Sequence, residues 1–365
     1  MPKVLIPVLI LSALIGWSSA RAGEAARPCH VSALQPGGRD SPAAETYSVG
    51  ARPLAVAAPE RGGVIDATLW YPTGSSGRRV VVGDDSPLFQ GTPALADSAI
   101  REGCRPLVVL SQGGLRSGPN IGAWMASRLA AKGFVVAMLR QPDPRHLTEA
   151  QTLPEIWLRP ADISAALTAI LGNADLSRHI DPDRIGVLGY QIGGTAALSL
   201  AGGRLDAASV QASCDAGGVG VDCGRFRKAG LDLRTIDAER LGRPNADARI
   251  RAIVVVDPEF SRDFTRASLE NISIPVSLVN LGRPEALWPG LDAQGLTRSI
   301  RQARYDAMPD ATQFSAFPLC KPGAADILRS DGEEAICDDP LGGRGRGQIH
   351  DALAQRVAAA FRSSF

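Results

Sequence analysis

Short apolar runs along the chain alternate with longer segments in which apolar residues recur at every third or fourth position. The runs are rich in Val, Ile and Leu, which is typical of parallel strands that are buried on both faces. The longer segments have the spacing of amphipathic helices, as at Ile121, Trp124, Met125 and Leu129. The predicted buried strands are residues 106–110, 134–139, 184–188, 250–256 and 275–281. This alternation predicts an α/β fold with a mostly parallel central sheet and helices on both faces.

The N-terminal part of the domain departs from this alternation. Residues 47–57 and 64–71 are separated by the turn sequence P-E-R-G-G and predict an antiparallel pair of strands. Residues 79–82 are expected to extend this pair at the edge of the sheet, and residues 84–105 to be irregular.

The C-terminal half contains an insertion and a less regular end. Residues 205–247 are polar and mixed in charge, and they predict an insertion over the carboxyl ends of the strands, where binding sites in such sheets form. Residues 297–308 are expected to be helical, and residues 311–317 to form a weak last strand. The apolar face of a closing helix is predicted at Ile349, Leu353, Val357 and Phe361.

The N-terminus has the pattern of an export signal. In residues 1–22, one lysine precedes an apolar run that is too short to span a membrane, and small residues then offer cleavage sites. Residues 23–45 are rich in Pro, Gly and Ala and are expected to be a leader, followed by a single domain at residues 46–365. The protein is therefore predicted to be periplasmic or secreted from a bacterial cell, with no membrane span after signal cleavage.

Composition and charge restrict the classes of partner. A hydrophobic content of 45% and a charged content of 21% are ordinary for a globular chain. The net charge of +1 gives no electrostatic reason to expect nucleic acid or an anionic membrane as a partner. The remaining partners are a small molecule or a periplasmic protein, and the sequence indicates no cofactor.

The six cysteines fit an oxidising compartment, where disulfides persist. The sequence alone leaves many pairings open. Local spacing favours Cys214 with Cys223 and Cys320 with Cys337, which leaves Cys29 with Cys104. There is no C-x-x-C sequence and no histidine near the Cys214/Cys223 or Cys320/Cys337 pair, so a metal site is not expected.

The most informative motif in the chain is a tight corner between a strand and a helix. The strand at residues 184–188 runs into G-Y-Q-I-G-G at residues 189–194, and an Ala/Leu-rich helical segment follows. This is the strand–turn–helix context of a nucleophile elbow, G-x-S-x-G, in which the central residue adopts a strained conformation. The residue at the apex is Gln191. A glutamine amide is not a nucleophile, so the corner predicts the fold without its usual chemistry.

The chain resembles the exported bacterial α/β-hydrolases known as predicted dienelactone hydrolases, which are relatives of the platelet-activating-factor acetylhydrolases. The resemblance covers nearly the whole mature chain and implies an α/β-hydrolase fold with a Ser–His–acid triad that cleaves carboxylic esters. It rests on D-A-T-L-W-Y-P-T at 66–73, P-L-V-V-L-S at 106–111, R-P-A-D-I at 159–163, D-R-I-G-V-L-G at 183–189 and F-S at 314–315 before Cys320.

The chain departs from the family at each catalytic position. Gln191 replaces the serine, Gln313 replaces the histidine base, and Glu285 is a loose match to the acid. The backbone amides of Ile192 and of the loop after the first core strand are expected to survive as oxyanion-hole donors. The residues predicted to form the pocket are Gln112, Gly113, Tyr190, Gln191, Ile192 and Gln313.

Another residue must supply a base if the protein is a hydrolase. His350, at the start of the last helix, is the candidate for such a rescue, although a structural histidine is the simpler interpretation. His146 follows a strand and can reach the pocket mouth, whereas His179 lies at the opposite edge and His30 in the leader. Asp257 ends a core strand and either faces the pocket or forms an Asx turn.

Three functions follow from these residues. The favoured hypothesis is a non-hydrolytic protein that binds a ligand or partner in the former active-site pocket. The alternatives are an esterase or lipase acting through a relocated site, and a structural protein with an occluded pocket.

Overall fold

The computed structural model describes Cys29 and residues 46–115, 117–143, 147–216, 223, 226, 229–339 and 343–365. The predicted signal peptide and, apart from Cys29, the predicted leader lie outside the described residues, as do His30 and His146.

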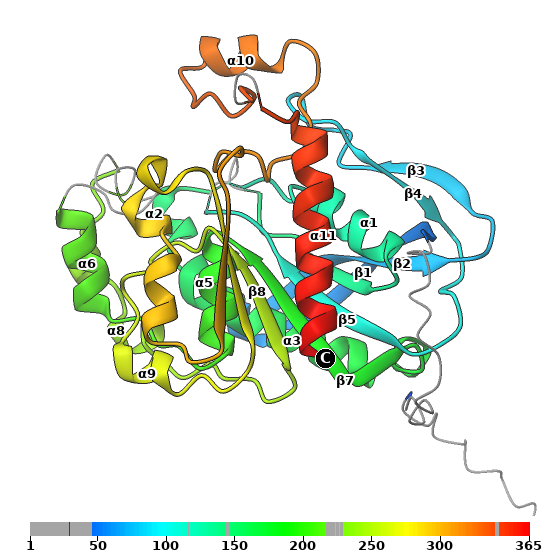
Figure 1. The fold of residues 1–365 in the computed structure, drawn as a ribbon, viewed down its shortest axis with the longest axis horizontal. Helices are drawn as coiled ribbons and strands as arrows, with labels where there is room; N and C mark the ends of the chain where they lie inside the picture. Colours follow the sequence, from blue (N-terminus) through cyan, green and yellow to red (C-terminus); the bar gives the residue numbers. More distant parts are fainter. Residues whose placement is uncertain are drawn as a thin grey trace, which may run out of the picture.

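The described strands form one ten-stranded sheet in the order β10-β9-β8-β7-β5-β6-β2-β1-β4-β3 (Figure 1). The first six strands of this order are parallel to one another. They are β5 (Arg105–Ser111), β6 (Val135–Leu139), β7 (Ile180–Tyr190), β8 (Ala252–Val256), β9 (Val276–Leu281) and β10 (Ala303–Met308). Every residue of β6 and β8 is buried, because helices cover both faces. The five predicted buried strands are confirmed.

The other edge of the sheet is antiparallel. The strands β1 (Ser48–Ala58) and β2 (Gly63–Thr73) form the predicted pair, and β2 joins β6. The edge strand β3 (Arg78–Val82) pairs with β4 (Thr92–Ala96), which lies in a segment expected to be irregular. That expectation is wrong for β4. Its sequence, T-P-A-L-A, contains Pro93; β4 lies between β3 and β1 but pairs with β1 only at Leu95, so the proline interrupts no pairing with β1.

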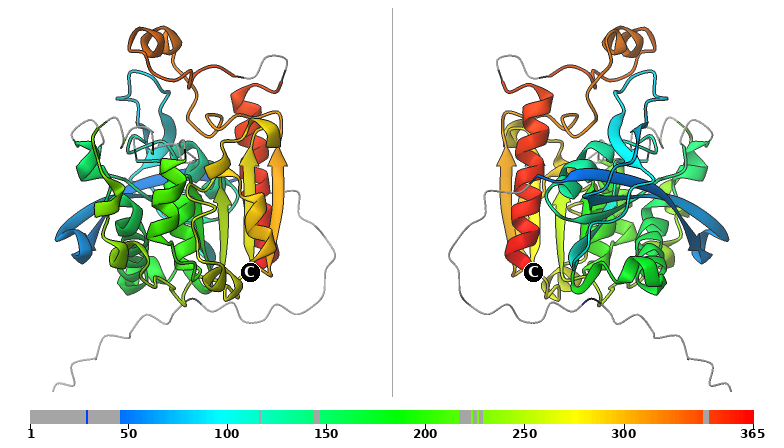
Figure 2. Two further views of the ribbon diagram at one scale, coloured as in Figure 1. Left: turned by 90° about the vertical axis from the view of Figure 1, so that its left-hand side faces the viewer. Right: turned by 90° about the vertical axis from the view of Figure 1, so that its right-hand side faces the viewer.

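Helices cover the sheet as two layers, each with its own apolar core. One layer contains α3 (Glu155–Gly172) and α5 (Ile192–Leu200), which contact each other. The opposite layer contains α1 (Ala123–Ala131) and α11 (Arg346–Ser364), and α11 is the red helix of Figure 2. The predicted face of the closing helix is buried in this second core.

Shorter elements connect these layers. The α-helices are α2 (Glu149–Thr152), α4 (Ala174–Ser177), α6 (Ala207–Asp215), α8 (Ala238–Leu241), α9 (Arg266–Glu270) and α10 (Ala324–Ser330). The 3-10 helices are η1 (Pro59–Arg61), η3 (Leu233–Thr235), η4 (Pro284–Ala286), η5 (Pro289–Leu291) and η6 (Gln294–Arg298). None of the helices in the described ranges is long and apolar enough to cross a membrane.

Two predictions near the C-terminus are wrong. Residues 297–308 contain the end of η6 and the strand β10 instead of a helix, and residues 311–317 form turns instead of a strand. The β10 sequence, A-R-Y-D-A-M, alternates Arg304 and Asp306 with less polar residues, because the strand lies at the sheet edge, where exposure alternates. Its pairing with β9 decides its conformation.

All six cysteines form disulfides, in the pairs expected from the sequence. The Cα atoms lie 5.5 Å apart in Cys29–Cys104, 5.2 Å apart in Cys214–Cys223 and 5.9 Å apart in Cys320–Cys337. Three disulfides are typical of a protein that folds in an oxidising compartment.

Candidate functional site

The corner between β7 and α5 has the backbone of a nucleophile elbow. Gln191 has φ 51° and ψ −120°, a region that costs about 1–3 kcal/mol for a residue with a side chain. Its N–H donates to the carbonyl of Val256 at 3.0 Å, and its own carbonyl accepts from the N–H of Glu259 at 3.3 Å. Backbone hydrogen bonds to the neighbouring segment therefore hold the strained residue in place.

The glycines of the corner are required by close packing. A Cβ atom on Gly189 would lie 2.1 Å from the carbonyl oxygen of Gly193, and one on Gly193 would lie 2.0 Å from the carbonyl oxygen of Ser111. Only glycine allows the first turn of α5 to pass this close to β5 and β7. The sequence thus builds the elbow whether or not a nucleophile occupies its apex.

Gln191 lines a cavity of about 1510 Å³ at the carboxyl ends of the strands. The walls come mainly from residues 82–90, 114–115, 117–121, 140–143, 314–318 and 327–336. Of the six residues that the sequence assigned to the pocket, only Gln191 lies in this lining.

The inserted segment contributes little to this cavity. Among its described residues, Ala229 alone lines it. The loop between β3 and β4 and the segment around α10 provide much of the wall. The sequence had predicted that residues 205–247 would cover the cavity instead. Part of that insertion lies outside the described residues.

Gln313 does not share the cavity of Gln191. It lines a second cavity of about 630 Å³, together with Trp288 and Asp310, and Phe314 borders both cavities. The Tyr190 hydroxyl donates to the backbone carbonyl of Gln313. The single pocket expected from the sequence is therefore corrected to two cavities, which share Phe314 in their linings.

Gln112 and Gly113 support the cavity wall without lining it. The Gln112 side-chain amide donates to the carbonyl of Pro119 at 2.7 Å and accepts from the N–H of Gly122, which ties the loop after β5 to the start of α1. A Cβ atom on Gly113 would lie 1.9 Å from the Ser117 hydroxyl, and its φ is +66°. Both residues fix the path of the loop.

Arg159 is a positioning residue that the sequence analysis missed. Its guanidinium is buried and donates to three successive carbonyls, at 3.2 Å from Gln112, 2.6 Å from Gly113 and 3.1 Å from Gly114. Burial lowers the pKa of Arg159, and the nearby Glu155 carboxylate opposes this effect. The R-P-A-D sequence was the available signal, and its arginine fixes the orientation of the three loop carbonyls.

An ion-pair network links Arg159 through Glu155 to Arg61 and Asp162. Arg61 contacts Glu155 at 2.5 Å and Asp162 at 2.6 Å, and Glu155 lies 3.5 Å from Arg159. Burial raises the pKa of Asp162, although its hydrogen bond to Arg61 favours the ionised form. Two motifs distant in the sequence thus form one buried cluster beneath the loop.

The acid predicted at Glu285 lies elsewhere. Glu285 is exposed in η4 and lines neither cavity. The buried carboxyl at the strand ends is Asp257, whose Oδ1 accepts from the Asn280 side chain at 2.8 Å and from the N–H of Leu281 at 2.9 Å. Burial raises the pKa of Asp257 to about 7. Asp257 lines neither cavity, and its hydrogen bonds join the end of β8 to β9.

His350 braces the turn that carries Gln313. Its Nε2 lies 3.0 Å from the carbonyl oxygen of Ser315 and 2.9 Å from that of Phe317, and its ring stacks on Trp124 with centroids 3.6 Å apart. Burial lowers the pKa of His350 to about 4. The residue is buried and lines neither cavity, so its contacts are those of a structural histidine.

The described lining of the larger cavity contains hydroxyl, amide and carboxylate groups, among them Ser86, Gln141 and Asp85. Neither cavity has a histidine or cysteine among its described lining residues. The remaining described side chains also include no group of three or more residues able to hold a metal ion. Hydroxyl groups at Ser86 and Ser117 line the larger cavity, but a serine attacks an ester only beside a base. The larger cavity therefore offers hydrogen-bonding groups, apolar surface and charged side chains such as Asp85 and Arg140.

Solved structures share this architecture. A ferulic acid esterase from Streptomyces cinnamoneus matches with a TM-score of 0.56 and 19% identity, over 87% of this chain and 90% of that chain. The chain has an α/β-hydrolase fold. Further matches to this hydrolase fold are a dienelactone hydrolase from Anabaena variabilis (14% identity, TM-score 0.45, covering 87% of this chain and 100% of that one) and a dienelactone hydrolase-like promiscuous phosphotriesterase from metagenomic libraries (14%, 0.48, 87% and 99%). No protein-family model and no curated protein sequence matches the chain.

Proposed function

We propose that this protein is an exported, non-hydrolytic α/β-hydrolase-fold protein that binds a small ligand in the Gln191 cavity. The observation that carries the proposal is the apex of the elbow. A glutamine occupies the strained position and its side chain lines a large cavity, so the scaffold presents an amide where a nucleophile would act.

The absence of a catalytic pair among the described residues supports this proposal. Hydrolysis through a serine needs a nucleophile and a base within hydrogen-bond reach of each other. Gln191 and Gln313 are amides that line different cavities, and His350 is held by two carbonyls. The three disulfides and the apolar N-terminal run support export.

An activity assay with a matched variant tests the proposal. The purified mature protein is expected to hydrolyse nitrophenyl butyrate no faster than its Gln191→Ala variant, and to resist labelling by a fluorophosphonate probe. Native mass spectrometry of protein isolated from the periplasm is expected to show a bound small molecule. Ester hydrolysis that is lost in a His350→Gln variant of unchanged fold would instead identify an esterase with a relocated site.

A further inference from the structure

The α10 segment, residues 321–336, projects beyond the body of the protein (Figure 2). It also borders the Gln191 cavity, which it lines with residues 327–328, 331–334 and 336. Because the segment stands away from the two helical layers and forms a wall of the cavity, its movement changes access to the cavity.

The base of the α10 segment is fixed to the rest of the protein. The disulfide Cys320–Cys337 joins its two ends, with the Cα atoms 5.9 Å apart. From the start of α11, the buried Arg346 guanidinium donates to the carbonyls of Pro318 at 3.3 Å and Ile336 at 2.5 Å. Both ends of the segment are therefore held by one covalent bond and one buried side chain.

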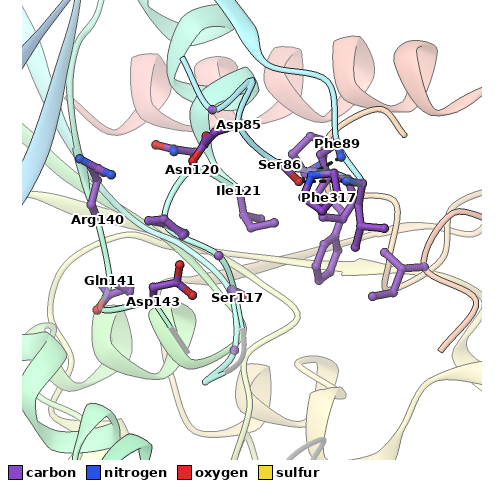
Figure 3. A pocket seen from close by; sticks show the side chains of 18 of the residues that line it. Asp85, Ser86, Phe89, Ser117, Asn120, Ile121, Arg140, Gln141, Asp143 and Phe317 are labelled. Atoms are coloured by element: carbon purple, nitrogen blue, oxygen red, sulfur yellow. Dashed lines mark hydrogen bonds between the residues drawn. The ribbon is translucent and has the colours of Figure 1, made fainter. Parts of the chain in front are cut away.

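This base lies at the rim of the cavity itself. Phe89 forms a β-bridge with Cys320 and packs against Phe317, with ring centroids 5.9 Å apart. Both rings line the cavity, and Figure 3 shows them together at one end, away from Arg140 and Gln141. The α10 segment is thus anchored at the aromatic end of the cavity.

The helix α10 is held less firmly than the base. Its buried residues are Ala324 and Leu328, one helical turn apart, whereas Ile327 is 40% exposed. Within the described ranges, the hydrogen bonds of α10 stay inside residues 321–333, and the helix makes no extensive contact with another helix or strand. A segment with so few contacts opens at a low free-energy cost compared with the core.

A glycine flanks α10 on each side. Gly323 has φ +81° and Gly332 has φ +67°, and nothing lies within 4 Å of a Cβ atom built on either residue. In contrast to Gly193 of the elbow, neither glycine is required by close packing. Their backbone dihedral angles can change without a clash, which is the property that a hinge needs.

We propose that the α10 segment is a lid, which moves about Gly323 and Gly332 on its fixed base and controls entry to the Gln191 cavity. Closing transfers the exposed Ile327 side chain from solvent into the cavity mouth, and this burial favours the closed position. The inference rests on the proposed binding function and adds a control of ligand entry.

A thiol placed in the cavity measures access to it. All six native cysteines form disulfides, so the Gln191→Cys variant carries a single reactive thiol at a position that is 5% exposed. Its alkylation rate is measured with iodoacetamide, which is small, and with fluorescein-5-maleimide, which is bulky. The exposed Gln294 lies outside the cavity lining, and Gln294→Cys gives the rates of an unobstructed thiol.

Removal of the lid gives the rate for an open cavity. In the Gln191→Cys protein, residues 322–335 are replaced by Gly-Ser-Gly, which spans the fixed ends because they lie close together. An open state populated at about 10% or less predicts that the maleimide rate rises at least about tenfold, and the iodoacetamide rate less. An unchanged maleimide rate contradicts control of entry by this segment.

A charge on the lid distinguishes a moving lid from a rigid wall. Adding Ile327→Asp to the Gln191→Cys protein disfavours the closed position, because closing would bury the carboxylate, and it is expected to raise the maleimide rate about tenfold. Ser330→Asp places the same charge on the same helix outside the cavity lining, and is expected to leave the rate unchanged. Equal rates in these two proteins, both folded by near-ultraviolet circular dichroism, overturn the lid even if the shortened protein does not fold.

Failure of the two proposals can be told apart. Labelling of the unmodified protein by a fluorophosphonate overturns the non-hydrolytic function and leaves the lid standing. Equal maleimide rates in the Ile327→Asp and Ser330→Asp proteins, without fluorophosphonate labelling, overturn the lid and leave the binding function standing.

Discussion

The corner at Gln191 and the turn at residues 312–317, which the sequence resemblance predicts to be the nucleophile and base positions, are held in different ways. Backbone hydrogen bonds and glycine contacts hold the corner, so its geometry does not depend on the side chain at the apex. Side chains from other elements contact the carbonyls of the turn. Trp124 donates to the Ala316 carbonyl at 2.9 Å, and His350 contacts the carbonyls of Ser315 and Phe317. The Tyr190 hydroxyl donates to the Gln313 carbonyl.

This difference accounts for the two cavities that Gln191 and Gln313 line. A position fixed by backbone packing keeps its orientation when its residue changes. A position fixed by surrounding side chains follows those side chains, and here they place Gln313 in a separate cavity. Three changes test the comparison.

The largest effect is expected from Gly193→Ala. The new Cβ would lie 2.0 Å from the carbonyl oxygen of Ser111, so either β5 or α5 must move. We expect a loss of about 4 kcal/mol or more in the free energy of unfolding, or no folded protein. Urea denaturation measures this loss. Gly347→Ala is the control, because nothing lies within 4 Å of its Cβ and the same change within a helix is expected to stabilise.

The turn is expected to show a pH dependence that His350 causes. His350 has a folded pKa of about 4 and a usual pKa of 6.5, so the unfolded chain binds a proton first as the pH falls. Its contribution is fully present above pH 6.5 and is lost as the pH falls towards 4, by about 3 kcal/mol in total. The free-energy difference between the wild type and His350→Gln, measured by urea denaturation, is therefore expected to be larger at neutral pH than at pH 4. Equal differences at both would show that His350 is not buried as a neutral ring.

The smallest effect is expected from restoring catalytic residues. The sequence alone predicts that the Gln191→Ser/Gln313→His double variant recovers weak esterase activity. The structure favours none, since residues 191 and 313 line different cavities. Hydrolysis of nitrophenyl butyrate by the double variant, compared with Gln191→Ser alone, decides between them. Activity in the double variant only would mean that the turn rearranges despite its contacts to Trp124 and His350.

The sequence by itself determined the features that depend on local pattern. Apolar runs predicted the parallel strands, and the glycines at 189, 193 and 194 predicted the elbow because close backbone approach excludes any Cβ. The three disulfides followed from cysteine spacing. These signals work because each is set by residues close together in the chain, or by elimination once those are assigned.

Only the tertiary structure decided features that depend on distant partners. β4 and β10 have weak apolar patterns and become strands because neighbouring strands pair with them. The direction of Gln313 depends on side chains of α1, β7 and α11, and the burial of Asp257 instead of Glu285 depends on how β8 and β9 end. No spacing rule contains these contacts, because their free energy arises only when the separated segments pack together.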